Sequence, residues 1–333
     1  MLRYKNFLSL FFISTLLTVL LVAFISLWEV ITPHNLVDQV IIIEPGASFI
    51  QVADELKDMG VINSPFILTS YKKFFRPKSF IKSGEYLINS NDSPISIVDN
   101  LFEGRVLFHQ FTIIEGWTFT QLLNNLRSHS VVNATNMTDS EIIDRLGINL
   151  DSLEGQFLAE TYNFVRGDSD IDILTNAHNL LKDTLNEAWK IGKNNVLNDP
   201  YQALVLASII EKETALSDER YIISGVFTKR LEKKMRLQSD PTVIYGLGNN
   251  FSGDITKDDL NDLNEYNTYR IDGLPPTPIC LVGKDSILSA VFPDNNNYLY
   301  FVATGNSDGK HFFSSSLADH NRAVEKYLSN IKY

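Results

Sequence analysis

Two glutamates lie within a strongly apolar stretch in the C-terminal half of the sequence. The stretch reads LASIIEKETALSDER, from Leu206 to Arg220, and the glutamates are Glu211 and Glu213. On a helix with about 100° per residue, Glu213 falls in the middle of an aliphatic arc that contains Ile209. Glu211 falls on another side, toward the edge of that face or the solvent. Because an apolar environment disfavours an ionised carboxylate, Glu213 is a candidate general acid that keeps its proton near neutral pH.

A structural interpretation of Glu213 stays open at this point. A glutamate in this place can instead be paired with an arginine or a backbone donor elsewhere in the fold, and helix geometry alone does not separate the two. Other chemistries have less support in the residues. The sequence has no histidine pair with metal-ligand spacing, no phosphate-binding glycine loop and no Gly-x-Ser-x-Gly nucleophile motif. We therefore predict neither a metal site nor a cofactor.

Composition limits the class of protein and its partners. The 333 residues are enough for one large or two ordinary domains, and 44% hydrophobic with 21% charged residues is typical of a folded chain. A formal net charge of −11 argues against a nucleic-acid partner, which requires basic patches. The single cysteine, Cys280, permits no intrachain disulfide and is interpreted as a small buried hydrophobe.

The N-terminus contains an uncharged run long enough to cross a membrane. From Phe7 to Trp28 there are 22 residues without a charge, preceded by Arg3 and Lys5 and followed by Glu29. A bilayer core needs about 20 apolar residues, and the basic flank stays in the cytoplasm. We therefore expect an uncleaved single-pass anchor with the rest of the chain exported. A cleaved signal peptide and a buried core helix are the alternatives, and the run is long for a signal peptide.

A repeated pattern follows the apolar run. SFIQVADEL, SPISIVDNL and TFTQLLNNL align without gaps and begin at Ser48, Ser93 and Thr118. Each begins with a good N-cap residue, continues with helical apolar spacing and follows a short extended run. The repeat predicts strand, turn and capped helix units, which pack as a small α+β module. Such units are similar to LysM-like modules that bind N-acetylglucosamine-containing glycans, although a plain packing module fits the pattern as well.

Five ordered motifs in the second half resemble a known family. They are ASIIEKET, RLQSDPTVIYG, YNTY, GLPPTPI and the C-terminal YLYFVATGNSDGKHFFSSSLADHN. With the N-terminal apolar run, SGEY at Ser83 to Tyr86 and EGW at Glu115 to Trp117, they resemble the YceG-like, or MltG-type, endolytic murein transglycosylases. The resemblance covers nearly the whole chain. FLAETY at Phe157 to Tyr162 and Thr277 depart from the usual family pattern.

The resemblance implies a lytic transglycosylase in which Glu213, the second glutamate of EKET, is catalytic. Glu213 would protonate the MurNAc–GlcNAc glycosidic oxygen and then help the MurNAc C6 hydroxyl attack C1, leaving a 1,6-anhydro end. An intramolecular nucleophile needs no second acid. An ordinary glycosidase uses two carboxylates. Candidates for a second carboxylate are Glu160, Asp240 and Glu211, each more often a structural residue.

The remaining motifs supply candidate substrate-binding residues. Aromatic rings suit the apolar faces of sugars, and amide groups suit hydroxyls and N-acetyl groups. Asp240 is expected to anchor the loop before Pro241. For His311 and Phe313 in the GKHFF segment, only the resemblance to the family favours a role in substrate binding. The candidate substrate-binding set is Gln238, Asp240, Tyr266, Asn267, Tyr269, His311 and Phe313.

The predicted organisation is α+β, with an N-terminal transmembrane helix, a small LysM-like module and a mixed α/β catalytic domain. The expected limits are residues 1–35, 36–108 and 109–333. The expected place of action is the outer face of the cytoplasmic membrane, with peptidoglycan strands as substrate and wall synthases as hypothetical partners. Two other functions remain: a non-catalytic cell-wall-binding scaffold, and a two-carboxylate hydrolytic muramidase.

Overall fold

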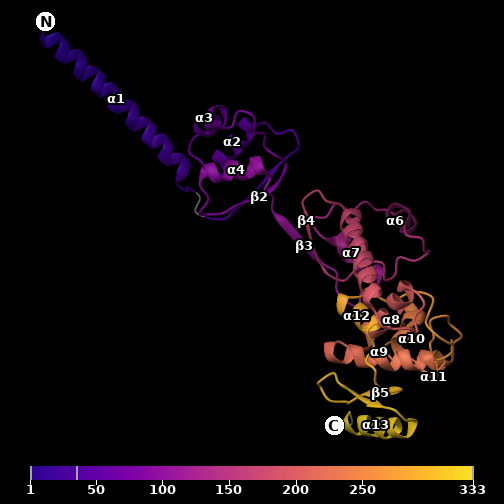
Figure 1. Ribbon diagram of the computed structural model, residues 1–333. Coiled ribbons are helices and arrows are strands. Elements are labelled where there is room, and N and C mark those ends of the chain that lie inside the picture. The colour runs from indigo at the N-terminus through magenta and orange to yellow at the C-terminus, as the bar shows by residue number, and fades with distance from the viewer. Residues whose placement is uncertain (1, 35–36, 332–333) are drawn as a thin grey trace. The chain divides into compact units, whose positions relative to one another are not determined.

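The N-terminal apolar run forms one long helix, α1 (Leu2–Ile31). In the computed structural model, which describes residues 2–34 and 37–331, Ser9–Ile31 is long and apolar enough to cross a membrane (Figure 1). None of the most hydrophobic part of this helix is buried against the rest of the protein. A helix that is apolar on all sides and stays exposed needs an apolar environment. The prediction of an N-terminal apolar helix is confirmed.

The chain divides into two compact units, and unit 1 comprises residues 1–109 and 164–167. After α1 its elements are β1 (Gln39–Ile43), α2 (Phe49–Asp58), α3 (Pro65–Phe75), β2 (Gly84–Ile88) and α4 (Pro94–Glu103). Strands β1 and β2 pair antiparallel, with Gln39 opposite Ile88 and Ile43 opposite Gly84. Side chains of β1, β2, α2, α3 and α4 share one hydrophobic core that includes Ile41, Leu56 and Leu101.

The repeated pattern of the sequence corresponds to three capped helices. Ser48, Ser93 and Thr118 are the N-cap residues of α2, α4 and α5 (Phe119–Ser128), and each side chain accepts a hydrogen bond from the backbone N–H three residues later. A strand precedes each helix, so the predicted strand, turn and capped helix units are present. The third of them belongs to unit 2 and not to the small N-terminal module.

The chain crosses between the two units along β3 (Phe108–Thr112) and β4 (Thr161–Val165), which pair with each other. Unit 2 comprises residues 110–163 and 168–333. Besides α5, its elements are α6 (Asp139–Leu146), α7 (Asp170–Ile191), α8 (Pro200–Glu213), α9 (Ser217–Glu232), α10 (Asp240–Leu247), the 3-10 helix η1 (Gly248–Asn250), α11 (Lys257–Asn261), α12 (Lys284–Val291), β5 (Tyr300–Ala303), β6 (His311–Ser314) and α13 (Leu317–Asn330). The fold is therefore mixed α+β, with sheets of two strands each.

Helix α8 lies at the centre of unit 2. It begins at Pro200, behind the N-cap Asp199, whose side chain accepts from the Gln202 N–H. Every residue from Ala203 to Ile210 is buried, and α7, α9, α10 and α12 all contact the helix. A helix that is apolar on all sides is a core helix. Its position is consequently fixed by packing from every direction, which suits a helix that must hold a functional group at its end.

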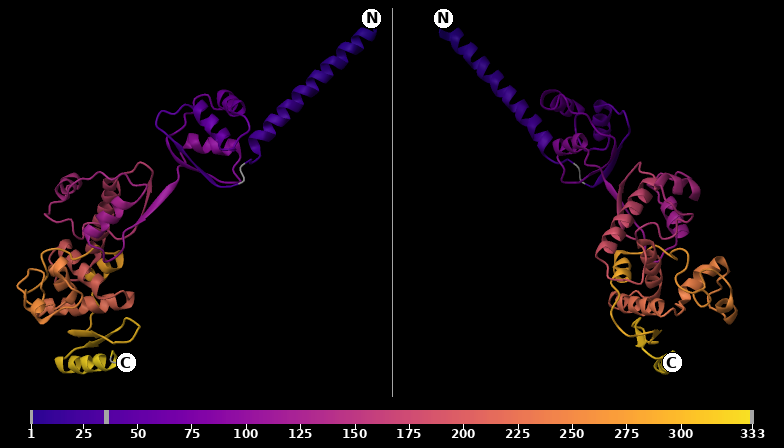
Figure 2. Two further views of the ribbon diagram at one scale, coloured as in Figure 1. Left: turned by 180° about the vertical axis from the view of Figure 1, so that it is seen from behind. Right: turned by 45° about the vertical axis from the view of Figure 1, so that its right-hand side comes forward.

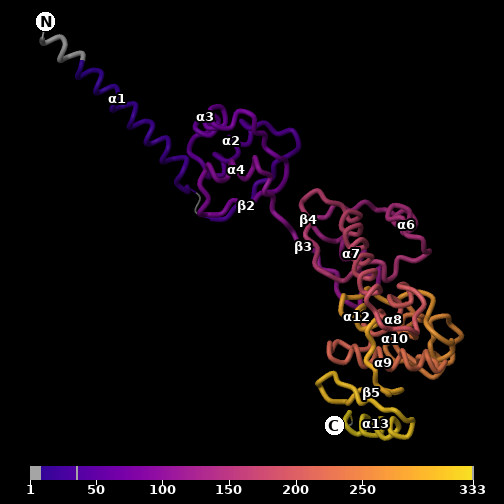
Figure 3. The backbone as a smooth tube through the Cα atoms, viewed as in Figure 1, coloured from indigo at the N-terminus to yellow at the C-terminus, as the bar shows by residue number. Residues whose placement is uncertain are grey.

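Two segments after α10 complete unit 2. Between α11 and α12, residues 262–283 form an irregular segment without helix or strand, which the backbone tube in Figure 3 shows next to α8 and α10. Farther along, β5 and β6 form an antiparallel hairpin in which Ala303 lies opposite His311. Helix α13 packs against both strands, as the two views in Figure 2 show. Both segments contribute side chains to the pocket described below.

Candidate active site

Glu213 is the last residue of α8, and this position decides what its side chain meets. The chain leaves the helix at Thr214, which has extended backbone angles while its N–H still donates to the Ile210 carbonyl. The side chain therefore lies at the rim of the hydrophobic core and not inside it. There it lines an open pocket of about 340 Å³ together with residues of α9, the segment before α10, and the β5–β6 hairpin.

The Glu213 carboxyl group has a strongly perturbed environment. The pKa of Glu213 is raised from 4.5 to about 7, chiefly by burial and with a smaller contribution from the neighbouring Asp240 charge, while Arg230 acts in the opposite direction. The Ser239 hydroxyl donates to Glu213 Oε1 at 2.5 Å, which favours the ionised form and limits the rise in pKa. A carboxyl group with a pKa near 7 is half protonated at neutral pH. It can both give and take a proton there, as acid–base catalysis requires.

Ser239 is held in place by buried threonines. Its backbone N–H donates to Thr268 Oγ1 at 2.9 Å, and its carbonyl accepts from Thr242 Oγ1 at 2.7 Å. The preceding Gln238 has a positive φ of 51°, a conformation that costs a non-glycine residue energy. Gln238 lines the pocket, and its Oε1 lies 3.4 Å from an Arg230 nitrogen. Sequence reasoning selected Gln238 and Asp240 but missed Ser239 between them.

Four of the predicted substrate-binding residues line the Glu213 pocket. They are Gln238, Asp240, Tyr269 and His311. The Tyr269 hydroxyl donates to Asp240 Oδ1 at 2.6 Å, which ties the start of α10 to the irregular segment. His311 Nδ1 lies 2.7 Å from Glu219 Oε2 on α9, and this contact holds the β6 end of the pocket. The pocket thus gathers groups from segments that are far apart in the sequence.

Three other predicted residues lie outside this pocket. Asn267 is 1% exposed, and its amide donates to the carbonyls of Asp259 and Asp262 while its Oδ1 accepts from the Tyr269 N–H. The expectation that Asn267 offers its amide to a sugar does not fit this arrangement, because the amide already holds the loop together. The Tyr266 hydroxyl is hydrogen-bonded to Thr277. Phe313 packs against the core beside Phe301.

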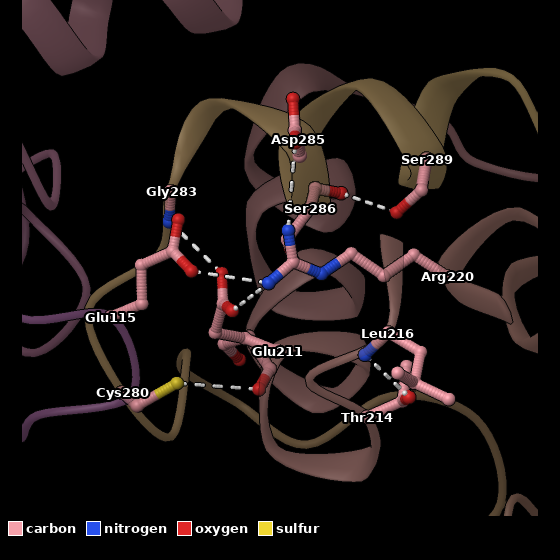
Figure 4. Close-up of polar contacts among 11 residues, drawn as sticks. Glu115, Glu211, Thr214, Leu216, Arg220, Cys280, Gly283, Asp285, Ser286 and Ser289 are labelled. Atoms are coloured by element: carbon pink, nitrogen blue, oxygen red, sulfur yellow. Dashed lines mark hydrogen bonds and ion pairs between the residues drawn. The ribbon is translucent and has the colours of Figure 1, made fainter. Parts of the chain in front are cut away.

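The expected orientation of Glu211 needs correction. Glu211, expected at the edge or in solvent, has a side chain only 3% exposed and forms an ion pair of 2.9 Å with Arg220. Its other oxygen accepts from the Gly283 N–H at 3.0 Å (Figure 4). Because α8 is apolar on all sides, periodicity could not indicate which glutamate faces protein and which faces a pocket. The arginine partner considered for Glu213 belongs to Glu211.

A second open pocket, of about 470 Å³, also has Glu213 in its wall. It is lined by the segment after β3, from Ile114 to Trp117, and by the end of α8 with the residues that follow, up to Ala215. Apart from the EGW motif, no pattern in the sequence indicated this pocket. Glu160, one candidate for a second carboxylate, lines neither pocket and accepts from the Thr161 N–H. Within residues 2–34 and 37–331, no cluster of three potential metal ligands is present.

Comparison with known proteins places the chain in a family. Residues 41–326 match the model of the YceG-like family. The chain belongs to the YceG-like family. An endolytic murein transglycosylase of Bacillus subtilis (strain 168) is 32% identical over 309 residues, which cover 86% of this chain and 84% of the relative.

Two further proteins are similar to the chain. An endolytic murein transglycosylase of Streptococcus pneumoniae serotype 2 (strain D39) is 24% identical over 86% of this chain, and the match spans 58% of that longer protein. The solved structure of a protein described as yceG-like, from Listeria monocytogenes, is 29% identical, with a TM-score of 0.49 over 86% of this chain and 98% of the other. The family expected from the sequence motifs is confirmed.

Proposed function

We propose that this protein is an endolytic murein transglycosylase that cleaves the MurNAc–GlcNAc bond of peptidoglycan strands with Glu213 as its acid and base. The observation that carries the proposal is the Glu213 carboxyl group, which has a pKa of about 7 and lies in the wall of an open pocket. The names of the relatives support the same reaction class. We propose that the polar and aromatic residues of the same pocket bind the glycan. They are Gln238, Asp240, Tyr269 and His311.

The proposed reaction needs one carboxyl group in two protonation states. Protonated Glu213 gives its proton to the glycosidic oxygen as the bond from that oxygen to C1 of MurNAc breaks. The C6 hydroxyl of the same MurNAc then attacks C1, and its proton passes to the Glu213 carboxylate. The products are a free GlcNAc hydroxyl and a 1,6-anhydroMurNAc end, without consumption of water. The nucleophile belongs to the substrate, which gives it a high effective concentration.

The test compares the full chain with Glu213→Gln in detergent, each incubated with purified uncrosslinked glycan strands. We expect 1,6-anhydroMurNAc ends from the parent and a loss of about 10²–10⁴-fold in rate for the variant, as for other general acids and bases. Mass spectrometry of the products measures both. Full activity of Glu213→Gln would exclude this role. Binding without cleavage by either protein would instead indicate a non-catalytic cell-wall scaffold.

A two-carboxylate muramidase is the second candidate, because Asp240 acts electrostatically on Glu213. In that reaction water attacks C1 and the product has an ordinary reducing end. The Tyr269 hydroxyl bonded to Asp240 favours a positioning role for this carboxylate. The same mass spectra decide between the two, since an anhydro end is lighter than a reducing end by one water.

We propose that α1 is an uncleaved anchor with a cytoplasmic N-terminus, so that residues from about 36 onward act at the outer face of the cytoplasmic membrane. The length of the apolar helix and the basic residues before it support this orientation. We further propose the functional division 1–35, 36–108 and 109–333. Anchoring confines the enzyme to newly made strands, which motivates a partnership with wall synthases. Failure of crosslinking in growing cells to recover any synthase would count against the partnership.

We also propose that unit 1 works as a LysM-like glycan-binding module. An open pocket of about 570 Å³ lies between the segment from Glu44 to Phe49 and the segment from Phe80 to Ser83. Phe80 is 79% exposed and offers an aromatic face beside this pocket. We expect Phe80→Ala to weaken binding of Glu213→Gln protein to purified peptidoglycan, as measured by cosedimentation, while Phe66→Ala, at an exposed phenylalanine outside the pocket, does not.

A further inference from the structure

A glycan strand that is cut in its interior has sugar units on both sides of the cleaved bond. The first Glu213 pocket can hold the sugars on only one of these sides. The second pocket, lined by Ile114–Trp117 and by the end of α8, shares Glu213 with the first. Both volumes fall in the range of sites that hold a small ligand. The two pockets therefore have Glu213 as a common wall, and the other residues that line the second pocket are candidates for a further sugar-binding site.

The Glu115–Trp117 segment is tied firmly to the protein behind it. The Gly116 N–H donates to the Leu281 carbonyl at 2.9 Å, and the Leu281 N–H donates to the Trp117 carbonyl at 2.7 Å. Lys212 on α8 donates to the Gly116 carbonyl at 3.3 Å. Backbone groups of Gly116 and Trp117 are thus fixed, so the backbone that carries the indole is held in place.

An ion-pair network, buried at Arg220 and Glu211 and half-exposed at Glu115, connects the same segment to α8. Figure 4 shows Arg220 between Glu115 and Glu211, with distances of 3.1 Å and 2.9 Å from its Nη2 atom to the two carboxylates. The Gly283 N–H donates to Glu211, and a Cβ at this position would lie 1.8 Å from Glu115 Oε1, so a side chain there would displace the Glu115 carboxylate. The network therefore positions the segment relative to the helix that ends in Glu213.

Trp117 stays partly exposed, although unit 2 contains a large hydrophobic core that could bury it. A partly exposed indole combines a large apolar face with one N–H donor, and side chains of this kind are enriched at binding interfaces. A pyranose ring has an apolar face of suitable size and hydroxyls at its edge. Polar groups of Lys212 and Thr214 in the same pocket can meet those hydroxyls.

From these contacts we infer that Trp117 is a sugar-binding platform, which holds a pyranose ring of the glycan strand next to the scissile bond, and that Glu115, Arg220 and Glu211 are its positioning residues. The inference rests on the proposed function, since it assigns part of the same substrate. It adds a binding residue that the EKET helix and the pocket around Asp240 do not contain.

The test measures binding without turnover. Full-length Glu213→Gln protein in detergent is titrated by calorimetry with peptide-free (GlcNAc–MurNAc)₄. Adding Trp117→Ala should weaken binding by about 10-fold, the loss typical of an aromatic anchor. Trp117→Phe, which keeps an aromatic face, should lose less. Tyr221→Ala is the matched control, because Tyr221 is an exposed aromatic of unit 2 that lines neither pocket.

Two outcomes overturn the inference. If Trp117→Ala binds the octasaccharide as tightly as its parent, the indole makes no productive contact. If Trp117→Ala and Trp117→Phe are equally weak and both unfold at lower temperature, the residue is structural. In either case the proposed reaction is still supported if the protein with Glu213 intact cleaves glycan strands and leaves 1,6-anhydroMurNAc ends. If the Glu213→Gln parent binds no glycan and the intact chain makes no cut, the proposed function fails together with the inference.

Discussion

Glu213 combines a large perturbation of its pKa with access to a pocket. Its pKa of about 7 is caused first by burial. If Glu213 gives the proton to the glycosidic oxygen, the free enzyme must be protonated at this group. We therefore expect kcat/KM for glycan cleavage to fall as pH rises through about 7. Measurements from pH 5 to pH 9 on soluble strands test this, and a rate that rises steadily over that range would exclude Glu213 as the acid.

Protein stability should follow the same titration. The folded-state pKa of about 7 exceeds the ordinary value of 4.5, so folding favours the protonated form. This contribution is complete below about pH 4.5 and is lost as pH rises through about 7. Glu213→Gln stays neutral and should be more stable than the parent at pH 8 by up to about 3 kcal/mol, at 1.4 kcal/mol per pKa unit. Denaturant unfolding at pH 4.5 and pH 8 measures the difference, and an equal gap at both values would contradict the assignment.

The Ser239 hydroxyl provides a second way to change the same pKa. Its hydrogen bond to Glu213 favours the carboxylate, so removing it should raise the pKa further. We expect Ser239→Ala to shift the alkaline limb of the pH–rate profile to higher pH. Thr242→Ser, which keeps a hydroxyl in the neighbouring network, is the control and should leave the limb in place. A shift of the limb to lower pH in Ser239→Ala would mean that the hydroxyl does not favour the carboxylate.

The sequence indicated which residue types gather near the acid better than it indicated their individual contacts. Gln238, Asp240, Tyr269 and His311 stand in short motifs, and the structure places them around one pocket. Asn267 stands in such a motif as well, yet its amide holds a loop. A sequence motif indicates that the local backbone conformation matters. Some residues of such a motif line the pocket, whereas others, such as Asn267, hold the loop together. Only the three-dimensional hydrogen bonds separate these cases.

At the scale of elements, the Glu211–Arg220 ion pair fixes the end of α8 against the start of α9. Both side chains are almost fully buried, at 3% and 6% exposure. Arg220→Met would leave a buried carboxylate without its partner, and we expect a loss of about 3–5 kcal/mol. Combining it with Glu211→Leu should recover much of that stability, because the uncompensated charge is removed. Denaturant unfolding of the full chain in detergent measures both variants.

The neighbouring Glu115 offers the matched control for this experiment. Its side chain is 47% exposed, and its contact with Arg220 is screened by water. Glu115→Gln should therefore cost less than about 1 kcal/mol. If Arg220→Met costs no more than Glu115→Gln, the buried pair does not stabilise the end of α8, and the rigid support of Trp117 must come from the backbone hydrogen bonds alone.

Secondary structure was predictable where local chemistry determines it. Ser48, Ser93 and Thr118 each begin a helix, because their side-chain oxygens satisfy an N–H that the helix leaves unpaired. The surroundings of α8 were not predictable in this way. Its residues from Ala203 to Ile210 are all buried, so their pattern contains no polar face from which to infer an orientation.

At the scale of the whole molecule, the chain joins an exposed apolar helix to a unit that carries a candidate active site. The helix could be predicted from composition alone, because an apolar run of 22 residues without a charge has the length that a membrane-spanning helix needs. The chain divides into two compact units between residues 109 and 110. The return of residues 164–167 to unit 1 could not be foreseen, since it depends on the pairing of β4 with β3.

The proposed topology can be tested with the single native cysteine as an internal control. Cys280 has no exposed surface and should react with a maleimide only after unfolding. We expect Ser329→Cys, at an exposed position of α13, to be labelled in intact cells by a maleimide that cannot cross the cytoplasmic membrane. Asn6→Cys, before the apolar run, should be labelled only after the membrane is opened.

The same cells distinguish an anchor from a cleaved signal sequence. An uncleaved anchor predicts that the membrane-extracted chain keeps the mass of the full sequence and resists extraction at high pH, because a spanning helix is held by its apolar contacts with lipid. A chain shortened by about the length of α1 and released without detergent would show that the helix only directs export. Labelling of Asn6→Cys in intact cells would reverse the proposed orientation. Cleavage would then have to occur inside the cell, where finished glycan strands are absent.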